Sequence, residues 1–276
     1  MRKSLLLVMT VLLCFCLSSC DKILNMAKSA VTGEEISKPP EDFIATIEGE
    51  EYTYELYEEY VKIIEYVGEA TEIEIPSEID DRPVKVIGTL CFNKKQVVSV
   101  TIPYSVKIIE NSAFYYADAL TSIVIPDTVE VIETRAFGWC NALESVVVGT
   151  GVEAIPDFCF NHCVSLASVE IPNNIKSIGV RAFSYCDKLT EITIPETITS
   201  VGDLAFEYCS ALKFVTFKNG ETQLGSNVFS NSPETAIVAA IDSGVYNYCF
   251  ENQLLWTDNI DTEPIKLNPE QETEQE

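Results

Sequence analysis

The chain has 276 residues and a formal net charge of −25, with 43 acidic residues against 18 lysines and arginines. Because 47% of the residues are hydrophobic, the composition is that of a globular protein and not of a disordered one. The acidic balance argues against nucleic-acid binding and against electrostatic docking on anionic lipid, since both need clustered Lys and Arg. A single histidine in the chain weakens most hydrolase, metal-site and proton-relay functions.

Residues 1–19 have the pattern of an export signal. The basic segment Met1-Arg2-Lys3 precedes an apolar stretch over 5–17 that is too short and wrongly flanked for a spanning helix. The stretch ends in Leu17-Ser18-Ser19-Cys20, which resembles a bacterial lipobox with Cys20 as the lipid attachment residue. We therefore expect an exported protein that is lipid-anchored at the bacterial cell surface and touches the membrane only through its anchor. An ordinary signal peptide with an incidental Cys20 is the alternative, and the membrane that carries the anchor stays open.

The segments on either side of the fold lack apolar periodicity. Residues 20–42 carry Gly33, Ser37 and the pair Pro39-Pro40, and we interpret them as a tether that lifts the folded part off the membrane. Residues 261–276 hold six acids and one lysine with little to bury, which predicts a disordered acidic tail.

Residues 43–68 alternate between apolar and polar over 43–47, 52–57 and 61–66, which predicts an antiparallel β cap. This part is strongly acidic, because residues 41–80 hold fourteen acids and only one base, Lys62. We interpret the charge as a solvated face that keeps the protein soluble and monomeric. A bound calcium ion or a basic partner is the alternative, although no D-x-D-x-D-G loop supports a dedicated calcium site.

An internal repeat of 23 residues occupies residues 69–235. Three apolar columns stay in register over six units: Val97, Leu120, Leu143, Leu166, Leu189 and Leu212; Ile102, Ile125, Val148, Ile171, Ile194 and Phe217; and Phe114, Phe137, Phe160, Phe183, Phe206 and Phe229. Proline follows the second column in most units, whereas Gly149 and Lys218 break this rule. One unit cannot bury its apolar face alone, so the period predicts a solenoid of stacked units.

Each unit is expected to be mainly β. The pattern L-x-x-I-x-I ends in strict alternation of β-branched residues, which predicts a strand that the following proline closes. A second short extended piece follows, for example at Val129–Ile132. The Ala-Phe pair then begins a tight turn, which we expect to be 3₁₀ or one helical turn. The predicted fold class is therefore a repeat solenoid.

The full unit reads L-x-x-I-x-I-P-x-x-V-x-x-I-x-x-x-A-F-x-x-C-x-x from Leu120, and it resembles the repeat of the BspA-like leucine-rich-repeat surface proteins of bacteria. The resemblance covers residues 43–257 and implies a leucine-rich-repeat horseshoe with N- and C-terminal caps. Residues 69–88 resemble the first unit of the family, lengthened by an insertion at 79–82. Ser243–Asn252 resembles the closing helix, within a capping segment at 236–260. The family implies a secreted or surface-held, non-enzymatic binding or adhesion module whose ligands differ among members.

Four cysteines follow the period: Cys140, Cys163, Cys186 and Cys209. In a stack of strands about 4.8 Å apart, this column is too long for four thiolates to share one zinc ion. Neighbouring cysteines with parallel Cβ vectors also fit a disulfide poorly. We interpret the column as small buried hydrophobic residues and expect no metal site. A disulfide between Cys159 and Cys163 stays open.

No catalytic constellation is found in the sequence. His162 has no second histidine to act with, and no G-x-S-x-G, H-E-x-x-H or P-loop motif occurs. We therefore expect no enzymatic activity, no catalytic residue and no cofactor.

One candidate surface is a row of ring side chains just ahead of the cysteine column. The column reads Tyr116, Trp139, His162, Tyr185, Tyr208 and Asn231. Aromatic platforms bind sugars and flat apolar protein surfaces well, so Tyr116, Trp139, Tyr185 and Tyr208 are candidate ligand residues. The alternative is that these rings cap the turns and cover the core from the convex side.

The other candidate surface is formed by the outward positions of the main strand, on the concave side where solenoids bind partners. Its candidate binding residues are Thr101, Val124, Val147, Glu170, Thr193, Phe214 and Thr216. A Ser/Thr-rich sheet face of this kind also keeps a protein soluble, and the composition favours no particular ligand.

Three functions fit these observations. The first is a surface lipoprotein that binds host-matrix proteins or neighbouring cells in an adhesion role. The second is a carbohydrate-binding surface module that uses the aromatic row, and the third is a structural spacer in a surface assembly. Proteins are the expected partners, with a glycan as the alternative and nucleic acid excluded, and the ectodomain is expected to be a monomer.

Overall fold

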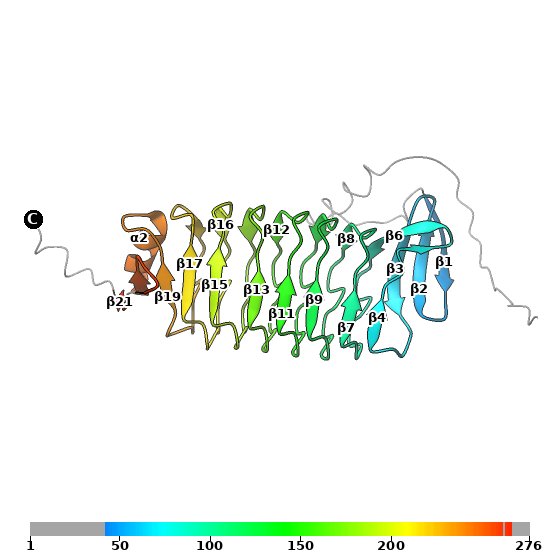
Figure 1. Cartoon of the computed structure of the whole chain (residues 1–276), viewed down its shortest axis with the longest axis horizontal. Helices are drawn as coiled ribbons and strands as arrows, with labels where there is room; N and C mark the ends of the chain where they lie inside the picture. Colours follow the sequence, from blue (N-terminus) through cyan, green and yellow to red (C-terminus); the bar gives the residue numbers. More distant parts are fainter. Residues whose placement is uncertain (1–41, 262, 267–276) are drawn as a thin grey trace, which may run out of the picture.

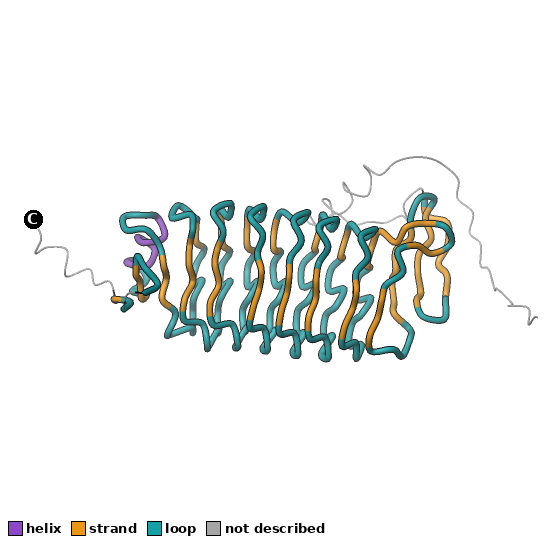
Figure 2. Tube along the Cα trace, in the orientation of Figure 1, coloured by secondary structure: helices purple, strands orange, loops and turns teal. Residues whose placement is uncertain are grey.

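The computed structural model describes residues 42–261 and 263–266, which form a β-solenoid with its rungs side by side along the long axis (Figures 1 and 2). Two rows of short parallel strands run along the solenoid. The main row contains β4 (Glu72–Glu74), β7 (Ser99–Thr101), β9 (Ser122–Val124), β11 (Ser145–Val147), β13 (Ser168–Glu170), β15 (Glu191–Ile194), β17 (Phe214–Phe217), β19 (Ala236–Val238) and β20 (Leu255–Thr257). The second row contains β6 (Arg82–Ile87), β8 (Ile108–Ile109), β10 (Val131–Ile132), β12 (Ala154–Ile155), β14 (Ser177–Ile178), β16 (Ser200–Val201) and β18 (Gln223–Leu224).

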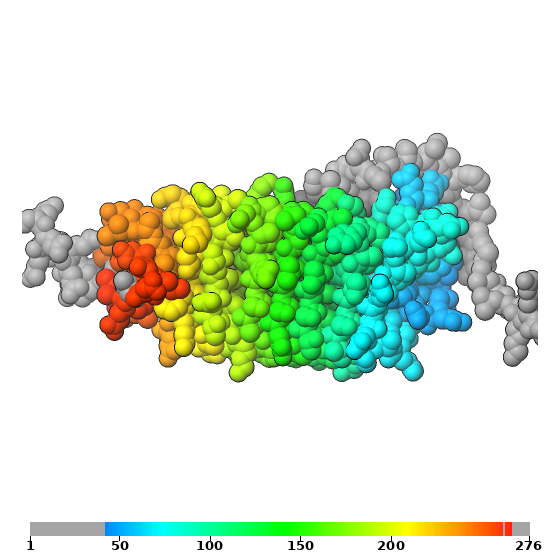
Figure 3. Space-filling view, in the orientation of Figure 1, coloured from blue at the N-terminus to red at the C-terminus, as the bar shows by residue number. Residues whose placement is uncertain are grey.

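The strands pair in the register that the sequence period predicts. Val146 of β11 lies opposite Ile123 of β9 and Val169 of β13, each 23 residues away. Because the register equals the period, every column of the repeat becomes a row of side chains along the solenoid. The space-filling view shows the rungs packed against one another along this axis (Figure 3). The predicted repeat solenoid is thereby confirmed.

The phenylalanine column forms the centre of the core. From Phe92 to Phe229 the rings are stacked, with neighbouring centroids 4.8–5.7 Å apart. The leading leucines beside them, Leu120 to Leu212, are fully buried. Tyr66 continues the stack into the N-terminal cap, with its centroid 5.6 Å from that of Phe92. Burial of these rings along the whole solenoid supplies much of the hydrophobic stabilisation that no single unit could provide.

The turn that contains each Ala-Phe pair differs from the 3₁₀ or helical turn that the sequence predicts. Two residues per unit have positive φ, for example Arg135 at 60° and Trp139 at 61°, and a right-handed helix cannot pass through such residues. Alternate backbone N–H groups bond to the next unit, and those between them close turns within the unit, as Gly138 N–H does to the carbonyl of Arg135. Phe137 N–H donates to the carbonyl of Cys159, and Trp139 N–H donates to that of Asn161. The turns therefore add a third ladder of hydrogen bonds between units.

Antiparallel strands close the N-terminal end of the solenoid. β1 (Phe43–Glu48), β2 (Tyr52–Tyr57) and β3 (Val61–Tyr66) form a meander, and β3 then pairs with β6 in parallel. The expected insertion is a hairpin of β5 (Glu78–Ile79) with β6. Asp80 and Asp81 at its tip both have positive φ, as a two-residue type I′ turn requires.

The C-terminal end is closed by helix α2 (Gly244–Glu251), where the closing helix was expected. Ser243 caps it, because its hydroxyl accepts a hydrogen bond from Tyr246 N–H. Two of the predicted segment boundaries differ from those in the structure, namely the end of the repeats and the start of the tail. The main row continues past residue 235 through β19 and β20, and β21 (Ile265–Lys266), which we assigned to the disordered tail, pairs antiparallel with β20.

The predicted signal peptide, the lipid-attachment residue Cys20, the tether up to residue 41 and the tail from 267 lie outside the described residues. Within the described part, no helix has both the length and the apolar character needed to span a bilayer.

Each row of strands is interrupted once. In the second row, β10 and β12 are not paired. At the equivalent position of other units a backbone N–H bonds to the preceding unit, as Gly179 N–H does to the carbonyl of Ile155. Pro156 stands at this position in the β12 unit and has no N–H to donate. In the main row the interruption lies between β13 and β15, where both strands belong to units with ordinary repeat sequences.

Candidate functional site

The seven residues predicted for the binding face all lie on the outward side of the main row, here called the strand face. Side chains alternate along each strand between the outside and the core. Val124 and Thr193 therefore point outward, while the residues before them, Ile123 and Ile192, are buried. Val124 is 60% exposed and lies beside Val147 of the next strand. Thr101, Glu170 and Thr193 are also exposed, whereas Val147, Phe214 and Thr216 are half-buried.

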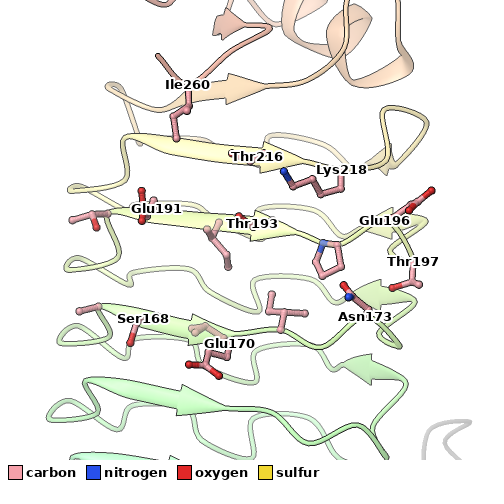
Figure 4. Close-up of a pocket in the computed structure, with 16 residues that line it drawn as sticks. Ser168, Glu170, Asn173, Glu191, Thr193, Glu196, Thr197, Thr216, Lys218 and Ile260 are labelled. Atoms are coloured by element: carbon pink, nitrogen blue, oxygen red, sulfur yellow. The ribbon is translucent and has the colours of Figure 1, made fainter. Parts of the chain in front are cut away.

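The strand face is hollowed over β13, β15 and β17 (Figure 4). This hollow has a volume of about 1090 Å³. It brings together Glu170, Thr193 and Thr216 from the predicted set, whereas the other four predicted residues lie outside its lining. The remaining polar and apolar groups of its wall include Ser168, Asn173, Glu191, Glu196, Lys218 and Ile260.

Sequence reasoning missed most of that wall for identifiable reasons. Glu196 follows the strand instead of lying on it, and Ile260 comes from beyond the repeats. Lys218 was detectable, because it replaces the proline that closes the strand in most units. The hollow also lies over β13 and β15, whose pairing is interrupted, and the period does not reveal this interruption.

The aromatic row forms one continuous stack. The centroids of Tyr116, Trp139, His162, Tyr185 and Tyr208 follow one another at 5.1, 3.8, 4.1 and 4.5 Å, with planes within 25° of parallel. Each inner ring therefore has both faces covered by its neighbours and presents only its edge. A sugar stacks on the face of a ring, so the geometry leaves the end of the stack at Tyr208, which is 39% exposed, as the platform.

His162 has a structural environment within this stack. It lies between the rings of Trp139 and Tyr185, and its Nδ1 is 2.8 Å from Oδ1 of Asn161. Partial burial between the rings lowers the pKa of His162, because it disfavours the charged imidazolium. The environment thus favours the neutral imidazole, which forms one more ring of the stack.

The cysteine column is buried, and it also has a role that the sequence did not reveal. Each thiol donates to a phenylalanine carbonyl 26 residues earlier, as Cys140 does to Phe114 at 3.1 Å and Cys209 to Phe183 at 3.1 Å. Ser232 takes the same place at the end of the column, with its hydroxyl 2.8 Å from the Phe206 carbonyl. The column is therefore a ladder of side-chain hydrogen bonds between units. Among the described residues, no group of His, Cys, Asp and Glu is arranged to hold a metal ion.

The seven cysteines of the described region are expected to be unreactive in the folded protein. Burial raises the pKa of the Cys209 and Cys249 thiols to about 12, and it raises those of Cys140, Cys159 and Cys186 well above their usual value. Reaction with a disulfide reagent requires the thiolate, and each pKa unit lowers its fraction about tenfold. In the protein comprising residues 21–276 we expect labelling at pH 8 to be at least about 100-fold slower than after unfolding in denaturant.

All seven thiols should then react in denaturant without a reductant, since Cys159 and Cys163 carry free thiols in the structure. N-acetylcysteine under the same conditions gives the reference rate. Fast labelling of the folded protein would contradict the burial of the cysteine ladder. If two fewer thiols than expected react in denaturant, Cys159 and Cys163 form a disulfide.

Comparison with known proteins relates the chain to one repeat family. The family model for the BspA type leucine rich repeat region matches in 6 copies, over residues 64–179 and 131–257. A solved leucine-rich repeat protein from Eubacterium ventriosum ATCC 27560 is 25% identical with a TM-score of 0.61, and the match covers 67% of this chain and 49% of that one. The leucine rich repeat protein of T. pallidum is 23% identical with a TM-score of 0.52, covering 70% of this chain and 81% of that one. A search of curated proteins found no match.

Proposed function

Because the chain belongs to the BspA-type leucine-rich-repeat family, which consists in general of protein-interaction modules and not of enzymes, we propose that it is a surface-held module that binds another protein through its strand face. The observation that carries this proposal is the strand face itself. An apolar middle at Val124 and Val147 is flanked by hydroxyl-bearing positions on one side and by the hollow on the other.

The shape of this surface fits a protein better than a small molecule. The strand face extends over nine strands, which at about 4.8 Å per strand is a distance of about 40 Å. Protein interfaces combine an apolar centre with a polar rim, and the strand face has both. The strands on either side of the interruption between β13 and β15 are hydrogen-bonded to their neighbours, so binding should cost little ordering entropy on the side of the solenoid.

The cellular setting is part of the proposal. Cleavage before Cys20 and lipid attachment to its thiol would leave the solenoid outside the membrane, tethered by residues 21–42. Binding to a host-matrix protein or to a neighbouring cell through the strand face would then give adhesion. The negative charge of the solenoid keeps it in solution as a monomer.

The test is a binding screen of the protein comprising residues 21–276 against matrix proteins and glycans side by side. For a protein that binds, the double variant Val124→Glu and Val147→Glu is expected to weaken binding by about 10- to 100-fold, because it places two charges in the apolar middle. The control is Ala154→Glu with Gln223→Glu, which adds the same charge at exposed positions of the second row. An equal loss in both double variants, with thermal stability unchanged, would contradict the strand face.

The glycan arm of the screen separates the rival function. Glycan binding that Tyr208→Ala abolishes, and that Val124→Glu leaves intact, would favour the aromatic row. If neither a protein nor a glycan binds, the result would favour the role of a structural spacer.

A further inference from the structure

Each pair of adjacent main-row strands meets at what is here called a joint. The joint between β13 and β15 differs from the other joints of the strand face. One joint further on, Lys213 N–H donates to the carbonyl of Thr190 at 2.8 Å. At the β13–β15 joint, the equivalent bond from Thr190 N–H to the carbonyl of Ala167 is not made, and both residues line the hollow. Val169, which occupies a core position that is buried in the neighbouring strands, is only half-buried here.

The opening is confined to the strand face. Behind it, β14 and β16 of the same two units are paired in regular register. The ring centroids of Phe183 and Phe206 in these units are 5.4 Å apart, within the 4.8–5.7 Å range of the stack. The units are therefore held at their normal distance, and an additional strand cannot enter between them, since it would need about 4.8 Å more. The gap between the two strands can therefore accept side chains from outside but not another strand.

The charged residues that line the hollow are mostly acidic. Glu170 lies on β13 and Glu191 on β15, on the two sides of the joint, and Glu196 follows β15 (Figure 4). Lys218 is the one basic residue of the lining. Within the described part of the chain, none of these four side chains forms an ion pair. Beside the second row, by comparison, Glu153 pairs with Lys176 of the next unit at 2.9 Å.

The floor of the hollow is apolar. Val169, Ile171 and Ile192 contribute to it, and Ile260 adds an exposed aliphatic side chain at its edge. A side chain with an aliphatic stem and a cationic head that donates hydrogen bonds therefore complements both the floor and the acidic rim. Arginine combines the two, because its guanidinium can bridge carboxylates and donate to a free backbone carbonyl while its stem covers apolar surface.

We propose that the hollow is the subsite of the strand face that receives an arginine side chain from a protein partner. The guanidinium would lie over the joint, with the diagonally placed Glu170 and Glu191 as its carboxylate partners and the Ala167 carbonyl as a further acceptor. This inference rests on the proposed function, since it names the chemistry of the partner segment for the same strand face. It also gives the unpaired acids a role, because an arginine would neutralise like charges carried by adjacent strands.

The test uses three nine-residue peptides that differ only at two positions: acetyl-Gly-Ser-Val-X-Val-X-Val-Ser-Gly-amide, with Arg, Gln or Glu at X. We expect the Arg peptide to bind residues 21–276 saturably in isothermal titration calorimetry, and its binding should weaken as salt is added. The other two peptides should bind at least about tenfold more weakly. The triple variant Glu170→Gln, Glu191→Gln, Glu196→Gln should lose about tenfold or more for the Arg peptide. The control triple variant Glu72→Gln, Glu74→Gln, Glu78→Gln removes the same charge from exposed positions at the N-terminal end.

A second variant tests shape instead of charge. Thr193→Trp fills the hollow without changing any charge, and it should also abolish binding of the Arg peptide. Equal losses in the two triple variants, equal binding of the Arg and Glu peptides, or no binding of any peptide would overturn the inference. The inference would also be overturned if a protein partner no longer bound the Val124→Glu, Val147→Glu variant but still bound the hollow variants. That outcome would leave the proposed function in place. If the Arg peptide binds in the hollow but no protein binds in the screen, the result would support the arginine subsite and count against protein binding through the strand face.

Discussion

Replacing Phe160 by alanine is expected to lower the free energy of unfolding by about 3–5 kcal/mol. The Phe160 ring is fully buried, and it lies between Phe137 at 5.6 Å and Phe183 at 5.5 Å between centroids. Removing it creates a cavity that interrupts the stack in mid-solenoid. The surrounding backbone cannot collapse into that space, because ladders of hydrogen bonds hold the neighbouring units in register.

Urea unfolding of the protein comprising residues 21–276 measures this loss. Tyr104→Ala is the control, since Tyr104 is 75% exposed, and its effect should stay within about 0.5 kcal/mol. Stability in a solenoid is a sum of unit and nearest-neighbour terms, so the Phe160 variant should also broaden or split the transition as its halves uncouple. A loss below about 1 kcal/mol would show that the aromatic stack is not the main source of cohesion between units.

The second large effect is expected at a glycine where the chain crosses close to its neighbouring unit. A Cβ atom on Gly151 would lie 2.3 Å from the Asp127 carbonyl oxygen and 2.4 Å from that of Val129. Both contacts are with backbone, which cannot rotate away as a side chain can. Gly151→Ala should therefore push the two units apart and lower the free energy of unfolding by about 2 kcal/mol or more.

Gly244→Ala is the matched control for this substitution. A Cβ there meets its nearest atom at an ordinary 3.5 Å, and Gly244 is the first residue of α2. Because alanine favours a helix more than glycine does, the control should be neutral or stabilising by up to about 1 kcal/mol. Equal stability of the two variants in the same urea titration would show that the backbone at Gly151 can relax.

These two predictions concern the elements that present the strand face. The phenylalanine stack sets the distance between units, and the close contact at Gly151 sets how two of them are joined. A binding surface that spans many units depends on both, because each strand contributes only one or two outward side chains. Loss of cohesion at Phe160 should therefore weaken binding of any partner that contacts strands on both sides of that unit.

The sequence alone determined the architecture of this protein. A period of 23 residues with three apolar columns is sufficient, because strands stacked in register place equal positions of successive units side by side. Leu143, Phe160 and Cys163 were thereby predicted to be buried, and they are. Strand alternation likewise placed Val124 and Thr193 on the outward side of the main row.

Only the tertiary structure decided what lies between the units. The left-handed residues of the turns, such as Trp139, cannot be read from residue type, because the bonds to the next unit hold them there. Stacking of the aromatic row covers the ring faces that the pattern suggested for a ligand. The hollow lies where β13 and β15 are not paired, and Ile260, from beyond the repeats, contributes to its lining. Periodicity describes what the units share, whereas these features depend on contacts in which two particular neighbours differ from the rest.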